Sequence, residues 1–277
     1  MTSQQQLAVL SAMKIEVYRR RSRAPAGTSP EAAAEQAKTP ALAEQAPGLA
    51  AAPAPRAPAA AQPVAGRVAD AAPAEAPLPS VEAMDWAALE AAVAHCERCT
   101  LSASRTRTVC GAGHRQARLM LIGEAPGRDE DLQGEPFVGR AGQLLDQMLR
   151  AIGLRRDAVF ITNILKCRPP GNRDPKPEEI ACCRGYLMRQ IALVQPALLL
   201  AVGRICAQTL RGTQQSIGRL RGAWHTMPET GLPLLVTYHP AYLLRQPSEK
   251  RKSWEDLKRV RARLHSVSDQ ASAAQPE

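Results

Sequence analysis

Residues 118–149 have the sequence RLMLIGEAPGRDEDLQGEPFVGRAGQLLDQML, and this stretch decides the fold. Its first five residues are an apolar run that predicts a buried strand. A glycine-rich turn, GEAPG, follows at 123–127. After Gly139 and Gly142, apolar residues at helical spacing predict a helix over 143–152. The stretch is therefore a strand, a polar loop and a helix in succession.

The same alternation continues toward the C-terminus. Strands are predicted at 118–122, 158–164, 197–202 and 234–238, and helices at 143–152, 177–194, 204–210 and 249–264. Continuous apolar runs indicate strands that are buried on both faces. The sequence thus predicts an α/β protein, a three-layer α/β/α sandwich with a mostly parallel four-stranded central sheet. In such sheets the active site gathers in loops beyond the carboxyl ends of the strands.

Composition divides the chain into four parts. Residues 1–22 carry apolar side chains at helical spacing and predict a short helix. Residues 23–80 are rich in Ala and Pro and offer few large side chains to bury, which predicts a disordered linker. Residues 81–265 form the expected folded domain, and 266–277 a disordered tail. The N-terminal helix is either a docking peptide for a protein partner or an extension without one.

The charge and hydropathy restrict the class of partner. The formal net charge is +10, from 36 Lys and Arg against 26 Asp and Glu. This excess favours a polyanion such as nucleic acid as partner, although a basic solvated surface would give the same count. No apolar run reaches the roughly 18 residues of a membrane span, and the N-terminus lacks the order of a signal peptide. We expect a cytoplasmic, monomeric protein that does not enter a membrane.

Polar side chains follow three of the predicted strands. Glu124 lies in the turn after the first strand, and Asn163 lies at the end of the second. His239, followed by Pro240, comes after the last. An amide offers the donor and acceptor needed to recognise a pyrimidine edge, and an imidazole can donate to a developing oxyanion. Taken singly, Asn163 could instead cap a turn and His239 could be an ordinary loop residue.

Phe137 is one of only two phenylalanines and lies in the polar, glycine-rich loop. There its ring could stack on a nucleic-acid base, the alternative being a core position. The loop lacks the GxxxxGK[ST] pattern, which argues against a P-loop nucleotidase.

Four cysteines suggest a metal site. Cys96 and Cys99 form a C-x2-C pair, and Cys167 and Cys183 lie in and after a proline-rich loop. Four thiolates can hold either tetrahedral zinc or a 4Fe–4S cluster, and the spacing does not choose between them. Cys182 is a competing ligand next to Cys183. A disulfide framework is not expected in a reducing compartment.

Together these motifs resemble the family 4 uracil-DNA glycosylases, also called type 4 or iron–sulfur enzymes. The resemblance covers roughly residues 86–260 and leaves out the first 80. The matching segments are GEAPGRDED, EPFVGRAGQLLD, TNILKCRPPGNRDPKPEEIACC, LLLAVGR and HPAYLLR.

The resemblance implies an enzyme that flips uracil out of DNA and hydrolyses its N-glycosidic bond. It would release free uracil and leave an abasic site for base excision repair. It also implies a 4Fe–4S cluster on Cys96, Cys99, Cys167 and Cys183. The family has a small residue where Cys182 stands, which favours Cys183 as the fourth ligand.

The same resemblance assigns the pocket. It implies that Glu124 and His239 are catalytic and that His239 contacts the carbonyl oxygen that gains charge. Phe137 would stack on the flipped uracil and Asn163 would read its edge. Gly123 and Glu130 would belong to the same substrate pocket. A related family that forms a covalent DNA adduct carries an Arg-rich insertion ending in a His, and this chain has no such insertion after its first motif.

Two rival hypotheses remain at this stage. A DNA-binding module would keep the basic charge and the cysteine site without chemistry, but it does not require polar residues after three separate strands. A zinc-dependent nucleotide hydrolase would bind zinc in place of iron. Excision of uracil from an oligonucleotide and metal analysis distinguish them.

Overall fold

A computed structural model describes residues 80–273, and the side chains of residues 80–266. The helix predicted at 1–22 and all of the predicted linker except Ser80 lie outside this range.

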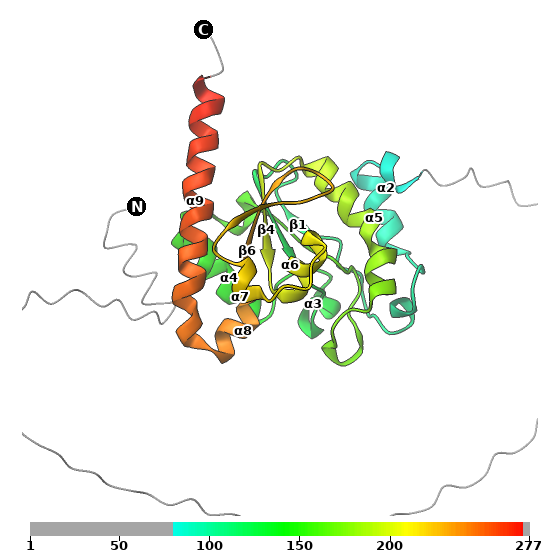
Figure 1. The fold of residues 1–277 in the computed structure, drawn as a ribbon. Coiled ribbons are helices and arrows are strands. Elements are labelled where there is room, and N and C mark those ends of the chain that lie inside the picture. Colours follow the sequence, from blue (N-terminus) through cyan, green and yellow to red (C-terminus); the bar gives the residue numbers. More distant parts are fainter. Residues whose placement is uncertain (1–79, 274–277) are drawn as a thin grey trace, which may run out of the picture. The chain divides into compact units, whose positions relative to one another are not determined.

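The described residues form one mixed sheet of six strands in the order β1-β3-β2-β4-β6-β5 (Figure 1). The strands are β1 (Ala112–Gly113), β2 (Leu119–Gly123), β3 (Phe160–Asn163), β4 (Leu198–Val202), β5 (Trp224–Thr226) and β6 (Pro233–Thr237). The central pairs β3-β2, β2-β4 and β4-β6 are parallel, which confirms the four predicted strands. The predicted number of four was too small, because β1 and β5 add an antiparallel strand at each edge. Strands of two and three residues are too short to show a period of two in the sequence.

Alternate residues of β2 face two different helical layers. Met120 and Ile122 pack in a buried cluster with side chains of α5 (Pro177–Val194) and α6 (Arg204–Arg211). Leu119 and Leu121 pack on the other face with side chains of α4 (Arg140–Ala151), α8 (Pro240–Arg245) and α9 (Lys250–Ala273). These layers lie on opposite sides of the sheet (Figure 1), so the predicted α/β/α sandwich is confirmed.

The described residues form more helices than the four that the sequence predicted within them. The α-helices are α2 (Trp86–Ala94), α3 (Arg128–Gln133), α4 (Arg140–Ala151), α5 (Pro177–Val194), α6 (Arg204–Arg211), α7 (Ile217–Leu220), α8 (Pro240–Arg245) and α9 (Lys250–Ala273). Short 3-10 helices are η1 (Val81–Ala83), η2 (Thr100–Ala103), η3 (Arg156–Ala158), η4 (Pro170–Asn172) and η5 (Pro247–Glu249). Helix α9 runs past 264 into the segment predicted as a tail. None of the described helices combines the length and apolarity needed to cross a membrane.

Local chemistry accounts for the helix that follows the proline-rich loop. Pro177 occupies the first turn of α5, where no backbone N–H is needed. The carboxylate of Glu179 accepts the backbone N–H of Lys176 at 2.8 Å. Gln195 ends the helix in a left-handed conformation. The predicted bounds of this helix are therefore those observed.

The parallel strands bring distant loops to one edge of the sheet. Gly123, the last residue of β2, is paired in register with Asn163, the last residue of β3. Beyond them the backbone N–H of Ile164 donates to the carbonyl of Gly123 at 3.0 Å. His239 follows the end of β6 and caps α8. The three loops predicted to carry the site therefore meet at the carboxyl edge, as expected for such sheets.

Candidate active site

A cavity of about 420 Å³ lies among the loops at the carboxyl edge of the sheet. Its lining residues are Glu124, Ala125, Pro126, Gly127, Glu130, Phe137, Ala141, Asn163, Pro169, Asn172, Arg173, His239, Ala241, Tyr242 and Arg245. Five of the six pocket residues predicted from the sequence are among them. The sixth, Gly123, is not a lining residue but lies next to the side chains of Asn163 and Phe137. The structure thus brings together side chains that are more than 100 positions apart in the chain.

Gly123 makes room for the side chain of Asn163. A Cβ atom at position 123 would lie 2.3 Å from the Asn163 Oδ1 and 2.7 Å from the Phe137 Cζ. The Asn163 Oδ1 is buried and accepts no hydrogen bond from the described residues. An acceptor buried without a donor is costly. The geometry therefore leaves this oxygen available for a donor that enters the cavity.

Phe137 has an unusual backbone for a residue with a Cβ atom. Its φ is 53°, in the left-handed region. Its carbonyl oxygen approaches α4 so closely that a Cβ atom on Gly142 would lie 1.7 Å from it. The ring lies beside that of His239, with centroids 5.6 Å apart and an interplanar angle of 30°. Phe137 is thus fixed next to the imidazole, with its ring on the cavity wall.

Glu130 supports the loop that carries Phe137. Its carboxylate accepts backbone N–H groups from Gly127 at 3.1 Å, Val138 at 3.0 Å and Gly139 at 3.2 Å. These bonds tie the start of α3 to the start of α4. Although Glu130 lines the cavity, both of its carboxylate oxygens accept hydrogen bonds from backbone N–H groups.

The hydrogen bonds of His239 determine its tautomer. Its Nδ1 accepts the backbone N–H of Ala241 at 3.1 Å. A neutral imidazole that accepts at Nδ1 carries its proton on Nε2. The pKa of His239 is lowered to about 4, chiefly by burial and also by the charge of Arg245, while Glu130 opposes the change. At pH 7 His239 is therefore a neutral donor through Nε2.

Glu124 has a raised pKa in this setting. The pKa of its carboxyl is raised from 4.5 to about 7, chiefly by burial and also by the charge of Asp174, while Arg204 opposes the shift. Asp174 and Arg204 pair with each other at 2.7 Å. Near neutral pH, Glu124 therefore exists in both protonation states.

Ten lining residues were not predicted as site residues, and four of them carry polar or charged side chains. Asn172 and Arg173 come from the proline-rich loop, and Tyr242 and Arg245 come from α8. All four lie inside motifs that the sequence analysis identified, but the sequence assigned no function to these residues. The Arg173 guanidinium pairs with both oxygens of the buried Glu179, at 2.9 and 2.5 Å.

The predicted cysteine ligands come from two segments that lie close together. Cys167 and Cys183 are buried, and Cys96 and Cys99 are partly buried. Arg105 joins the two segments, since its Nη1 donates to the Cys167 Sγ at 3.5 Å and to the Cys96 carbonyl at 2.6 Å. All cysteines in the described part of the chain are free thiols. No three metal-binding side chains among the described residues form a group able to hold a metal ion.

The thiols influence one another electrostatically. Burial raises the pKa of Cys183, and the charges of Cys99 and Cys96 raise it as well. Burial also raises the pKa of Cys99, and Cys182 and Cys96 add to that shift. Cys182 lies at the same segment, with its Sγ donating to the Arg98 carbonyl at 3.2 Å. The structure therefore places both Cys182 and Cys183 close to the C-x2-C pair.

Comparison with known proteins assigns the chain to a class. Residues 110–258 match the model of the uracil DNA glycosylase superfamily. That region includes the whole cavity lining and leaves out Cys96 and Cys99.

Individual relatives narrow the assignment. The chain is 43% identical over 171 residues to the type-4 uracil-DNA glycosylase of Archaeoglobus fulgidus, covering 60% of this chain and 86% of that protein. It is 43% identical over 181 residues to the Saccharolobus solfataricus type-4 enzyme, covering 63% and 84% of the two chains. For the Sulfurisphaera tokodaii type-4 enzyme the identity is 43% over 176 residues, covering 61% and 80%. The chain belongs to the type-4 uracil-DNA glycosylases.

Proposed function

We propose that this chain excises uracil from DNA by hydrolysing its N-glycosidic bond, with the cavity as its active site. The observation that carries the assignment of the site is the buried, unpartnered Oδ1 of Asn163, which lies in one cavity with Glu124, Phe137 and His239. Family membership supports the reaction. Since the bond is hidden in a stacked duplex, the nucleotide must be extruded first, at a cost of a few kcal/mol.

Asn163 selects the base. Uracil presents an N–H donor at N3 beside a carbonyl acceptor, and the amide of Asn163 offers the matching acceptor and donor. Cytosine presents the reverse pattern on that edge, so its binding would leave the buried Oδ1 without a donor. An unmade hydrogen bond at a buried polar group costs about 1–3 kcal/mol. Gly123 is part of this selection, because any larger residue would displace the amide.

Phe137 holds the extruded base by stacking. Base–aromatic stacking contributes about 1–3 kcal/mol per base, which offsets part of the cost of extrusion. The ring already lies beside His239, so a base stacked on it comes within reach of the imidazole.

His239 stabilises the leaving group. Cleavage places negative charge on the departing uracil, and the Nε2–H of a neutral imidazole can donate to the carbonyl oxygen that gains that charge. One such donor contributes about 2.7–4 kcal/mol to a transition state. The low pKa of His239 keeps the imidazole neutral across the physiological range, and the Ala241 N–H that binds Nδ1 keeps the proton on Nε2.

Glu124 acts as a carboxylate on the sugar side of the bond. Its negative form can orient the attacking water or stabilise the positive charge that develops on the sugar. Either role needs the deprotonated state. Because burial raises its pKa to about 7, the reaction should depend on pH near neutrality.

A 4Fe–4S cluster on Cys96, Cys99, Cys167 and Cys183 is part of the proposal. The chemistry of the donor set fits, since all four residues are free thiols and the Arg105 guanidinium donates to the Cys167 Sγ, where a thiolate would need compensation. Four thiolates are the usual ligands of such clusters. Bound there, the cluster would tie the C-x2-C segment to the proline-rich loop. The hydrolysis moves no electron, so its role is structural.

Single-turnover uracil release tests the proposal. The purified full-length protein is incubated with oligonucleotides that carry one uracil, cytosine or thymine at the same position. Release of uracil alone is expected, and Asn163→Ala should abolish most of it while leaving the affinity for undamaged DNA unchanged. Equal release of cytosine, or full activity of the variant, would contradict the proposed site. DNA binding without release would favour the binding-module hypothesis.

The cellular location and the oligomeric state are inferred from the sequence alone. A cytoplasmic, monomeric enzyme acting on uracil-containing DNA remains our proposal. A protein partner for residues 1–22 remains one as well, and it lies outside the described residues.

A further inference from the structure

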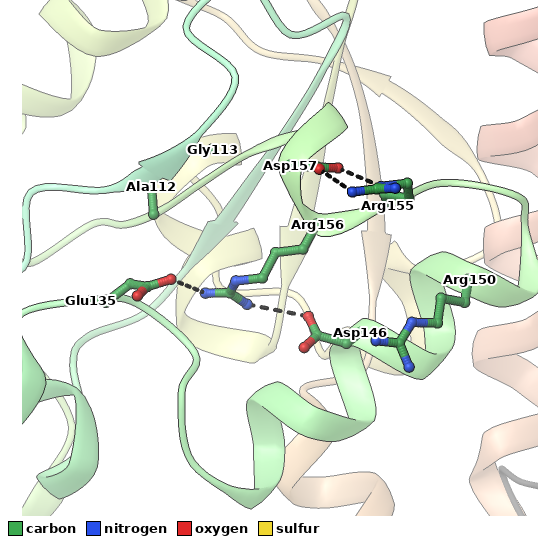
Figure 2. A pocket seen from close by; sticks show the side chains of 8 residues that line it. All are labelled: Ala112, Gly113, Glu135, Asp146, Arg150, Arg155, Arg156 and Asp157. Carbon is green, nitrogen blue, oxygen red and sulfur yellow. Dashed lines mark hydrogen bonds and ion pairs between the residues drawn. The ribbon is translucent and has the colours of Figure 1, made fainter.

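A second cavity, of about 510 Å³, lies on the protein apart from the catalytic one. Its lining residues are Ala112, Gly113, Glu135, Asp146, Arg150, Arg155, Arg156 and Asp157 (Figure 2). None of them lines the catalytic cavity. Three arginines face three carboxylates, so the formal charges of the lining cancel and do not favour an anionic ligand. Arg156 differs from the other two arginines because it reaches the loop that carries Phe137.

The Arg156 guanidinium connects four groups. Its Nη1 donates to the Phe137 carbonyl at 3.2 Å and to the Asp146 carboxylate of α4 at 3.3 Å. Its Nη2 donates to the Pro136 carbonyl and to the Glu135 carboxylate, the latter at 3.3 Å. Figure 2 shows the guanidinium between the two carboxylates. One side chain therefore binds two successive carbonyls of the loop and anchors them to α4.

The peptide group that links Phe137 to Val138 is held at both ends by charge. Its carbonyl accepts from the Arg156 cation. Its N–H donates to the Glu130 carboxylate at 3.0 Å. Rotation of this peptide group would break both bonds at once. Glu130 and Arg156 thus fix the ψ of Phe137 together. The Arg156 bond to the Pro136 carbonyl holds the preceding peptide group, whose orientation sets the φ of Phe137.

Phe137 needs such support. A φ of 53° is disfavoured for a residue with a Cβ atom, and residues held in such conformations persist only where surrounding contacts enforce them. The direction of the Phe137 ring depends on that φ. Arg156 starts η3, which leads directly into β3, the strand that ends at Asn163. The Phe137 ring, held through Arg156, and the Asn163 amide are therefore both positioned by the segment that forms η3 and β3.

We infer that Arg156 is a positioning residue for uracil excision, which sets the stacking face of Phe137 through the backbone of its loop. The inference rests on the proposed function, since it requires that Phe137 stack on the base.

A double-mutant cycle tests this inference. Single-turnover uracil release is measured for the full-length wild type, Arg156→Ala, Phe137→Ala and the double variant, over a range of enzyme concentrations. Arg155→Ala is the matched control, because it removes the same charge next in sequence and in the same cavity. The Arg155 side chain is 81% exposed and pairs with Asp157. Thermal melting is recorded for each protein.

The expected outcome is a loss that is not additive. Arg156→Ala should slow the maximal rate roughly ten- to a hundredfold, the scale of a small misplacement at an active site. The double variant should be no slower than Phe137→Ala, while Arg155→Ala stays at the wild-type rate. The half-saturating enzyme concentration should change less than the rate, since DNA contacts elsewhere are intact.

Three results would overturn the inference. Equal rates for Arg156→Ala and Arg155→Ala, with Phe137→Ala still slow, would remove Arg156 and leave the proposed function intact. Multiplied losses in the double variant would show that Arg156 acts independently of the ring. A wild-type rate for Phe137→Ala would contradict the stacking role itself, and the inference with it.

The conservative variant Arg156→Lys separates positioning from folding. Its ammonium keeps the charge but cannot span two carbonyls with the fixed geometry of a guanidinium. We expect a melting temperature close to that of the wild type and a rate between those of the wild type and Arg156→Ala. A full wild-type rate would show that the two-carbonyl contact is unnecessary and would also overturn the inference.

Discussion

The raised pKa of Glu124 predicts how the rate depends on pH. If only the carboxylate is active, a pKa of about 7 leaves about 9% of the enzyme active at pH 6 and about 91% at pH 8. The maximal rate should therefore rise about tenfold between these values. With the ordinary value of 4.5, about 97% would already be active at pH 6, and the rate would be nearly flat.

His239 does not complicate this pH window. Its pKa of about 4 keeps it neutral from pH 6 to 8, so a single ionisation should describe the profile. The activity is present above the pKa of Glu124 and is lost as the pH falls through it. Single-turnover uracil release at saturating enzyme gives the profile, and circular dichroism at each pH confirms that the fold is unchanged.

Variants of the neighbouring charges test the cause of the shift. Asp174→Asn should move the midpoint to lower pH, because the charge of Asp174 raises the pKa of Glu124. Arg204→Gln should move it to higher pH. Both shifts should be small, since the two side chains are more than half exposed. Glu124→Gln should be slow at every pH. A wild-type rate that stays flat from pH 6 to 8 would refute the reasoning.

Three further predictions concern single residues. His239→Ala should slow uracil release roughly 10²–10³-fold, the cost of one oxyanion donor, and near-normal single-turnover rates would remove it from the site. Gly123→Ala should lose most uracil release but keep its affinity for undamaged DNA in a gel-shift assay, because the new Cβ would lie 2.3 Å from the Asn163 Oδ1. An active Gly123→Ala enzyme would show that the amide can move without penalty. Cys183→Ser should give a colourless, less stable protein with low iron content, whereas Cys182→Ser should keep its visible absorption; the reverse result would exchange their roles as ligands.

Much of the fold was predictable because its determinants are local. The apolar runs at β2 and β4 are buried on both faces, and such runs are visible in the sequence. Pro177 and Glu179 mark the start of α5 for the same reason. The edge strands β1 and β5 were missed since they are short, and pairing with a neighbour defines them. Helix α9 was predicted too short, although no proline or glycine interrupts the chain between Leu264 and Ala273.

The residue types of the candidate site could be predicted from the sequence. The contacts that hold those residues in position could not. Glu124, Asn163 and His239 follow buried strands, and the rule for parallel sheets places such residues together. Arg156 could not be recognised, because two of its partners are backbone carbonyls, which leave no pattern in the sequence. The same holds for the engagement of Glu130 with three backbone N–H groups.

The sequence by itself determined the four central strands and four of the helices in their order along the chain, the loops that carry chemistry and the cysteines that can bind a metal. Those features depend on residue type and spacing along the chain. Only the tertiary structure decided the protonation states of Glu124 and His239 and left the buried Oδ1 of Asn163 without a donor. It also decided the contacts of Glu130 and Arg156 with the backbone around Phe137. Each of these depends on which groups the fold buries together, and burial acts between atoms that are neighbours in space and distant in sequence.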